Sequence, residues 1–132
     1  MSDKVENFYK LLPEGIRAVV KTHMQPIDNA TADYLCQELD DYLKQIQKRA
    51  IKNKNIDLKL IDRMIECFKS LLKKFPHMGE DEKLIISAAT RYFIDFEDAQ
   101  SDFNDPFGFD DDLAVLNAAL LATGREAKVI QR

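Results

Sequence analysis

Carboxylates that could bind a divalent cation are concentrated in one part of the sequence. Residues 92–124 contain eight Asp and Glu residues and no Lys or Arg. Hard cations such as Mg²⁺ and Ca²⁺ prefer carboxylate oxygens as ligands. A helical hairpin could bring four of these acids together, and they form the candidate metal site: Asp98, Asp102, Asp111 and Asp112. The first chemistry that the sequence allows is therefore binding of Mg²⁺ or Ca²⁺.

Two other interpretations of the same acids stay open. In the first, the acids are structural: Asp98 and Asp102 bond turn amides, while Arg91 or bases from residues 44–74 neutralise the rest. In the second, the segment is an acidic docking surface for a basic protein partner. Its apolar anchors would then be three aromatic residues, Phe103, Phe107 and Phe109. We prefer the simpler explanation that these rings pack against the core.

The acids divide into two groups by their position relative to the expected helices. Three acids come directly before an apolar run: Asp110, Asp111 and Asp112. At such a position a carboxylate can cap free N–H groups and meet the positive end of the helix dipole. Asp95, Asp98 and Asp102 would share one face near a helix C-terminus, where like charges cost a few tenths of a kcal/mol each. This second group therefore needs a neutralising cation, basic partner or Arg or Lys from another helix.

The acidic segment resembles the YkvA-like family, a small domain of unknown function. The resemblance covers residues 88–121, and the matching positions are Tyr92, Asp98, Asp102, Gly108, Asp111 and Asp112. Phe96 and Ser101 stand where the family usually has proline. The resemblance implies a helix–turn–helix hairpin with an Asp-rich turn and supplies no known reaction.

Composition limits the class of protein. The 132 residues are 45% hydrophobic and 32% charged, which fits one compact domain over residues 1–132. The pI of about 5.2 argues against a nucleic-acid partner. We expect no transmembrane segment and no signal peptide, because no apolar run is long enough. Cys36 and Cys67 are expected to be free thiols, so we place the protein in the cytoplasm.

Apolar spacing predicts helices almost throughout. They cover residues 4–12, 14–23, 30–52 and 57–75, then a segment after Gly79 that includes Tyr92, and finally residues 110–122. Residues 28–31 and Asp57 offer N-caps, Gly124 is a natural C′ residue, and the tail after it is expected to fray. The predicted fold is an all-α, compact single-domain bundle of five or six helices with an Asp-rich hairpin near the C-terminus.

We expect a binding or structural module with the acidic hairpin as its contact or cation site, and we assign no catalytic residue. The alternative is a divalent-metal-dependent enzyme, hydrolytic or acting on phosphate, that uses the same Asp cluster. The most basic stretch, residues 44–55, is read as a solvated helix end. It could instead meet the acidic hairpin of a second subunit and form an antiparallel homodimer.

Overall fold

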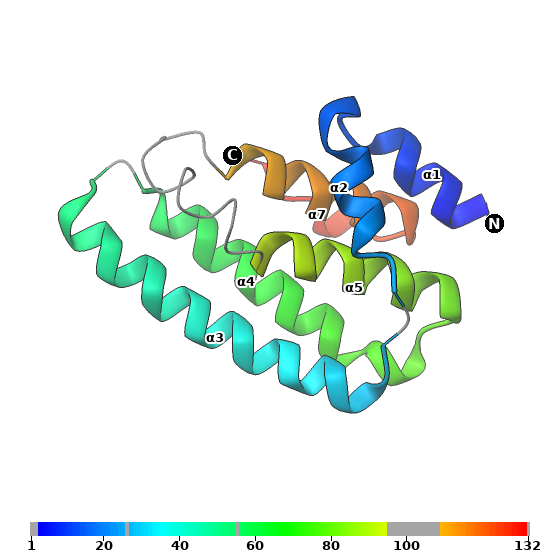
Figure 1. Ribbon diagram of the computed structural model, residues 1–132, viewed down its shortest axis with the longest axis horizontal. Coiled ribbons are helices and arrows are strands. Elements are labelled where there is room, and N and C mark those ends of the chain that lie inside the picture. The colour runs from blue at the N-terminus through cyan, green and yellow to red at the C-terminus, as the bar shows by residue number, and fades with distance from the viewer. Residues whose placement is uncertain (1–2, 26, 55, 95–108, 132) are drawn as a thin grey trace.

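The computed structural model describes residues 3–25, 27–54, 56–94 and 109–131. These ranges hold six α-helices and no strand, which confirms the predicted all-α bundle (Figure 1). The helices are α1 (Asp3–Leu11), α2 (Arg17–Thr22), α3 (Asn29–Lys52), α4 (Leu58–Lys73), α5 (Glu80–Ile94) and α7 (Asp110–Ala122). Three short 3-10 helices are η1 (Glu14–Ile16), η2 (Phe75–His77) and η3 (Glu126–Lys128).

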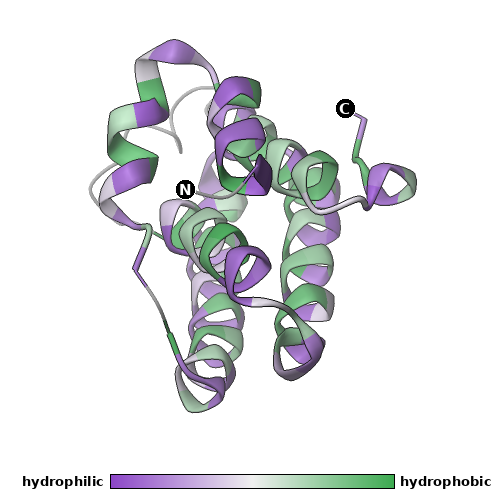
Figure 2. Ribbon diagram, turned by 90° about the vertical axis from the view of Figure 1, so that its right-hand side faces the viewer, coloured by the Kyte–Doolittle hydropathy of each residue, from purple (hydrophilic) through white to green (hydrophobic). Residues whose placement is uncertain are grey.

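Helix α5 lies in the middle of the bundle and packs against α1, α2, α3, α4 and α7. The two longest helices, α3 and α4, pack along each other on one side of α5, while α7 and α1 lie on the other side (Figure 1). The apolar faces of the helices turn inward and the polar faces outward (Figure 2). A central helix needs apolar or small residues on every side. Between Ile85 and Ile94, every residue of α5 except Arg91 is buried.

Aromatic rings join the two sides of the bundle. The Phe93 ring on α5 meets Tyr42 of α3 edge to face at 5.3 Å between centroids and stacks on Phe68 of α4 at 5.1 Å. All three side chains are buried, and such pairs add about 0.5–1.5 kcal/mol each beyond the area they bury. The centre of the fold is therefore fixed by contacts between residues far apart in the sequence.

The predicted N-caps of the two long helices are confirmed. An Asp28 carboxylate oxygen accepts the Thr31 N–H at 2.8 Å at the start of α3, and Asp57 accepts the Leu60 N–H at 3.1 Å at the start of α4. Each cap satisfies an N–H that has no partner within its helix and stabilises it by about 1 kcal/mol.

The prediction that the C-terminal tail frays is wrong. Asn117 donates its amide to the Ile130 carbonyl and accepts the Ile130 N–H, both at 2.9 Å, and the Ile130 side chain is buried. Gly124 has the expected positive φ of 75°, and the bonds from Gly124 N to Leu121 O and from Arg125 N to Leu120 O form a Schellman turn. That turn folds the tail back onto α7, which the tail's polar composition does not show.

The remaining sequence expectations concern the membrane and the thiols. Within the described ranges, no helix has both the length and the apolar character needed to cross a bilayer. Cys36 and Cys67 are free thiols, each partly buried, as expected.

Candidate functional site

The acid-rich residues 95–112, here called the acidic segment, follow the end of α5 and include the start of α7. Helices α5 and α7 pack together, and the Phe93 ring near the end of α5 lies 6.3 Å from the Phe109 ring just before α7. The predicted metal ligands Asp98 and Asp102, and the predicted anchors Phe103 and Phe107, lie outside the described residues. The described part of the candidate site therefore consists of residues at the end of α5 and at the start of α7.

Three consecutive acids form the first turn of α7. Asp110 and Asp111 are exposed, whereas Asp112 is only 5% exposed. Helix α7 begins at Asp110, as predicted, and its N-cap position is held by Phe109, whose side chain makes no cap bond. The burial of the Phe109 ring fixes where the helix starts, so the acids lie inside the first turn and meet the positive end of the dipole there.

Phe109 is a core residue. Its side chain is 5% exposed, and its ring joins the aromatic contacts that Phe93 makes with Tyr42 and Phe68. The preferred interpretation, packing against the core, is therefore the one that applies to Phe109, and its ring is not exposed as a partner anchor. Its packing holds the start of α7 against α5 and, through Phe93, against α3 and α4.

The predicted metal site includes two carboxylates that face different surroundings. Successive residues of an α-helix point about 100° apart. Asp111 accordingly faces solvent while Asp112 turns into the protein. Among the residues that the structure describes, no group of three or more His, Cys, Asp or Glu side chains is placed to hold a metal ion. The four-Asp set stays a prediction, since Asp98 and Asp102 are not described.

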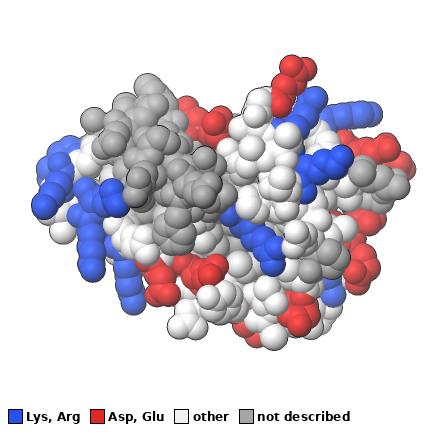
Figure 3. All heavy atoms as spheres, in the orientation of Figure 1, with Lys and Arg blue, Asp and Glu red and all other residues white. Residues whose placement is uncertain are grey.

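Basic side chains gather at the same end of the molecule. The C-terminal end of α3 lies on the same side of the bundle as the end of α5 and the start of α7 (Figure 1). This part of α3 carries Lys44, Lys48, Arg49 and Lys52. Lys and Arg side chains cluster there at the left-hand edge of the space-filling view (Figure 3). Bases of the C-terminal part of α3 are therefore on the side of the bundle where α5 ends and α7 begins.

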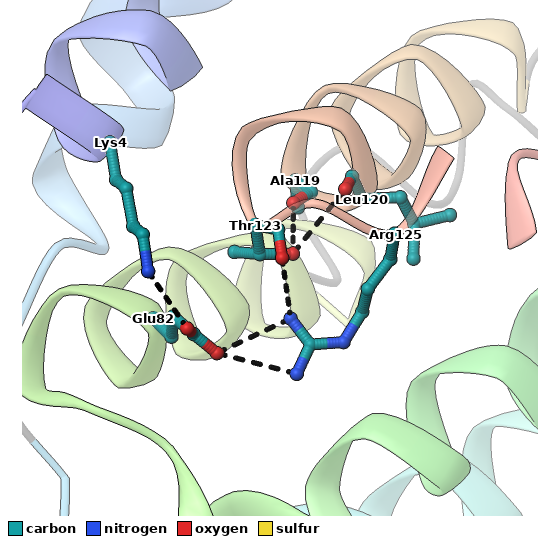
Figure 4. A network of polar contacts seen from close by, with 6 residues as sticks. All are labelled: Lys4, Glu82, Ala119, Leu120, Thr123 and Arg125. Carbon is teal, nitrogen blue, oxygen red and sulfur yellow. Dashed lines mark hydrogen bonds and ion pairs between the residues drawn. The ribbon is translucent and has the colours of Figure 1, made fainter. Parts of the chain in front are cut away.

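A different arrangement of charges fixes the opposite end of α5. Glu82, in the first turn of α5, pairs with Lys4 of α1 at 2.9 Å and with Arg125 of the tail at 3.3 Å (Figure 4). Burial works to raise the pKa of Glu82, but the hydrogen bonds and positive charges of Lys4 and Arg125 outweigh it and hold that pKa below its ordinary value. Sequence reasoning missed this network because the partners are 78 and 43 residues from Glu82.

A groove lies between α4 and the C-terminal tail. Its volume is about 500 Å³, and it is lined by Asp62, Arg63, Glu66, Cys67, Ser70, Lys128 and Ile130. Burial raises the pKa of the Cys67 thiol, although the positive charge of Lys128 acts in the opposite direction. A thiol that stays protonated is a poor nucleophile, so Cys67 is not activated for nucleophilic catalysis. Sequence reasoning could not find this groove, because one wall is the tail that was expected to fray.

Comparison with family models, with curated proteins and with solved structures finds no match for this chain. Its function must therefore be argued from its own residues.

Proposed function

We propose that the protein is a binding module that contacts a basic protein segment through its acidic segment, residues 95–112. The observation that carries this proposal is the exposure of Asp110 and Asp111 on the first turn of α7, at the point where the acid-rich sequence joins the bundle. Exposed acids of one sign attract a basic partner over several ångströms and raise its rate of association.

The described geometry supports a contact surface better than a catalytic centre. A catalytic metal site needs several converging carboxylates, an open coordination position and a pocket for substrate. Asp111 and Asp112 diverge instead, one toward solvent and the other into the protein. A docking surface requires only that the acids be accessible and held by a rigid support. The aromatic packing of Phe109 against Phe93 provides such a support.

We also propose a cellular location, from the two cysteines, and a family, from the resemblance of the acidic segment. Two partly buried free thiols persist best in a reducing compartment, and we propose the cytoplasm. The YkvA-like resemblance over residues 88–121 would make the acidic turn a shared feature of that family.

The proposal is tested by fluorescence anisotropy with a labelled Lys- and Arg-rich peptide. We expect binding that weakens as salt is raised, and an affinity about 3- to 10-fold lower for the Asp110→Asn/Asp111→Asn double variant. The matched control is Glu6→Gln/Glu14→Gln, which removes two exposed acids from α1 and η1. Equal loss of affinity in the two double variants would show only a general charge effect and would overturn the proposal.

A cation is tested separately by calorimetric titration of metal-free protein with Mg²⁺, Ca²⁺ and Mn²⁺. Heat that disappears in both Asp98→Asn and Asp111→Asn would identify the acids as a cation site. If the metal also abolishes peptide binding, the cation site replaces the peptide proposal. Absence of heat with metal at about 1 mM would leave the peptide result to stand alone.

A further inference from the structure

The outer face of α3 carries an arrangement that the proposed function does not use. The side chains of Leu35, Leu39, Tyr42 and Ile46 turn α3 toward the core. The residues on the opposite side are all exposed, and we define the outer face of α3 by eight of them: Asp33, Tyr34, Gln37, Asp41, Lys44, Lys48, Ile51 and Lys52. From Tyr34 to Ile51 they are spaced by three and four residues, which keeps them on one side of the helix, and Asp33 and Lys52 flank the two ends.

Two large apolar side chains mark the ends of this face. Tyr34 is 60% exposed and Ile51 is 73% exposed, the highest values among the large hydrophobic residues that the structure describes. In a monomer both side chains remain in water, although burying an Ile or Tyr side chain is favourable by about 1.5–3 kcal/mol. A single exposed apolar residue needs no explanation, but two at matching ends of one polar stripe suggest a contact.

Charge along the outer face is segregated. Its acids, Asp33 and Asp41, precede Tyr42 in α3, whereas its three lysines follow Leu43. Among the described residues, none of Lys44, Lys48 and Lys52 forms an ion pair. The acid of α3 that does pair is Asp40, which meets Lys69 of α4 at 2.8 Å and lies outside the outer face. Each half of the outer face therefore presents charge of one sign to solvent.

The positions of these residues are symmetric about a point between Tyr42 and Leu43. Residues equally distant from that point lie opposite each other when two copies of α3 pack antiparallel around a two-fold axis. The symmetric pairs are Asp33 with Lys52, Tyr34 with Ile51, Gln37 with Lys48, and Asp41 with Lys44. Every acid of the outer face then meets a lysine, and each exposed apolar side chain meets the other.

We propose that the outer face of α3 binds a second copy of this chain, forming a symmetric dimer in which the two α3 helices pack antiparallel. The two-fold axis makes each contact occur twice, so the dimer contains four acid–lysine pairs and two Tyr34–Ile51 contacts. This interface differs from pairing between the basic stretch and an acidic hairpin, because both charges come from α3 itself.

A groove beside the outer face fits this arrangement. It has a volume of about 180 Å³ and is lined by Tyr34, Glu38, Asp41, Gln45 and Ile94. In the antiparallel pair, Ile51 of the second copy approaches Tyr34 at the edge of this groove. Exposed ion pairs contribute only about 0.2–1 kcal/mol each, so the dimer is weak and sensitive to salt.

The test is sedimentation velocity of the full chain. At about 100 µM protein we expect dimer at about 0.02 M salt and monomer at about 0.5 M salt. Two charge-swapped variants make the test specific. Asp33→Lys/Asp41→Lys makes the outer face wholly basic, whereas Lys44→Asp/Lys52→Asp leaves Lys48 as its only base and makes it predominantly acidic. Each variant alone should be monomeric at low salt, whereas an equimolar mixture of the two should form a heterodimer.

The controls separate this interface from folding and from the acidic segment. Asp62→Lys/Glu66→Lys reverses two exposed charges on α4 and should leave dimerisation unchanged, while far-UV circular dichroism checks that every variant is folded. Ile51→Ser should weaken the wild-type dimer about 3- to 10-fold. Monomeric wild-type protein at low salt, or a mixture that stays monomeric while both variants are folded, would overturn the proposal. Peptide binding by Asp33→Lys/Asp41→Lys reports on the acidic segment, so either proposal can fail alone.

Discussion

The two ends of α5 arrange their charges in different ways. At the first end, Glu82 lies between Lys4 and Arg125 and makes an ion pair with each. At the other end, the first turn of α7 places Asp111 in solvent, and this carboxylate makes no ion pair with a described residue. The first arrangement joins α1, α5 and the tail, whereas Asp111 joins nothing in the described part of the fold.

This difference separates charges that maintain the fold from charges that are available for binding. A half-buried carboxylate with two cationic partners is costly to remove, because its partners lose their hydrogen bonds as well. An exposed carboxylate at a helix N-terminus contributes only a modest dipole interaction. The acidic end must therefore be held in place by something other than its charge, and the aromatic contacts of Phe93 provide this.

The largest expected effect comes from removing that aromatic support. Phe93→Ala should lower the free energy of unfolding by about 3–5 kcal/mol, because it deletes contacts with Tyr42, Phe68 and Phe109 and leaves a cavity. Urea denaturation measures this loss. Tyr34→Ala removes an aromatic side chain that is 60% exposed and should cost no more than about 0.5 kcal/mol in the monomer. Similar losses in the two variants would show that the acidic end has no aromatic anchor.

The next effect concerns the tail at the paired end of α5. Asn117→Ala should cost about 2–3 kcal/mol, since the Ile130 N–H and carbonyl both lose their side-chain partner. Amide hydrogen exchange should show faster exchange at Ile130, and urea denaturation should show the lower stability. Gln47→Ala, which removes an exposed amide side chain from α3, is the control and should change neither measurement. An unchanged Ile130 exchange rate in Asn117→Ala would mean that the tail is held by other contacts.

These effects also show which parts of the structure the sequence predicts. Local signals identified the helices: Asp28 and Asp57 are correct caps, and Gly124 has the positive φ expected after α7. The packing of the tail could not be predicted in this way. It depends on Asn117 and Ile130 matching two backbone bonds across a turn, which no composition or periodicity records.

For the candidate site, the sequence supplies the position of the acids and not their surroundings. Its position in the sequence was visible from charge alone, because acids without compensating bases stand out in composition. The different burial of Asp111 and Asp112 was not visible, since it depends on how α7 packs against α1 and α5. The Glu82 network was missed for the same kind of reason. Its partners are distant in sequence, so only the packing of α1, α5 and the tail brings them together.

A smaller effect should come from Glu82 itself. Glu82→Gln removes the charge that Lys4 and Arg125 share, and should cost about 1–2 kcal/mol at neutral pH. The pKa of Glu82 is held below its ordinary value in the folded protein, so its contribution is present above the unfolded pKa and is lost as pH falls through the folded pKa. The gap between wild type and Glu82→Gln in thermal unfolding should therefore narrow below about pH 4.5.

Glu80→Gln is the matched control for that experiment, because Glu80 lies in the same first turn of α5 but is exposed. It should lose only the dipole interaction, about 0.3–1 kcal/mol. A pH dependence that is the same in Glu80→Gln and Glu82→Gln would contradict the assignment of the acid sensitivity to the Lys4–Glu82–Arg125 network.

The smallest effect is expected at the acidic end and is the sharpest test of the comparison. Asp111→Asn gives up a favourable interaction with the α7 dipole, worth about 0.3–1 kcal/mol, but it also relieves repulsion between neighbouring acids by a similar amount. The free energy of unfolding should thus change by less than about 0.5 kcal/mol. Asp112→Asn alters a carboxylate that is 5% exposed, so it should cost more than Asp111→Asn in the same denaturation experiment. If Asp111→Asn lowered the free energy of unfolding as much as Glu82→Gln, the charges at both ends of α5 would maintain the fold. The proposal that the acidic segment is a contact surface would then be contradicted.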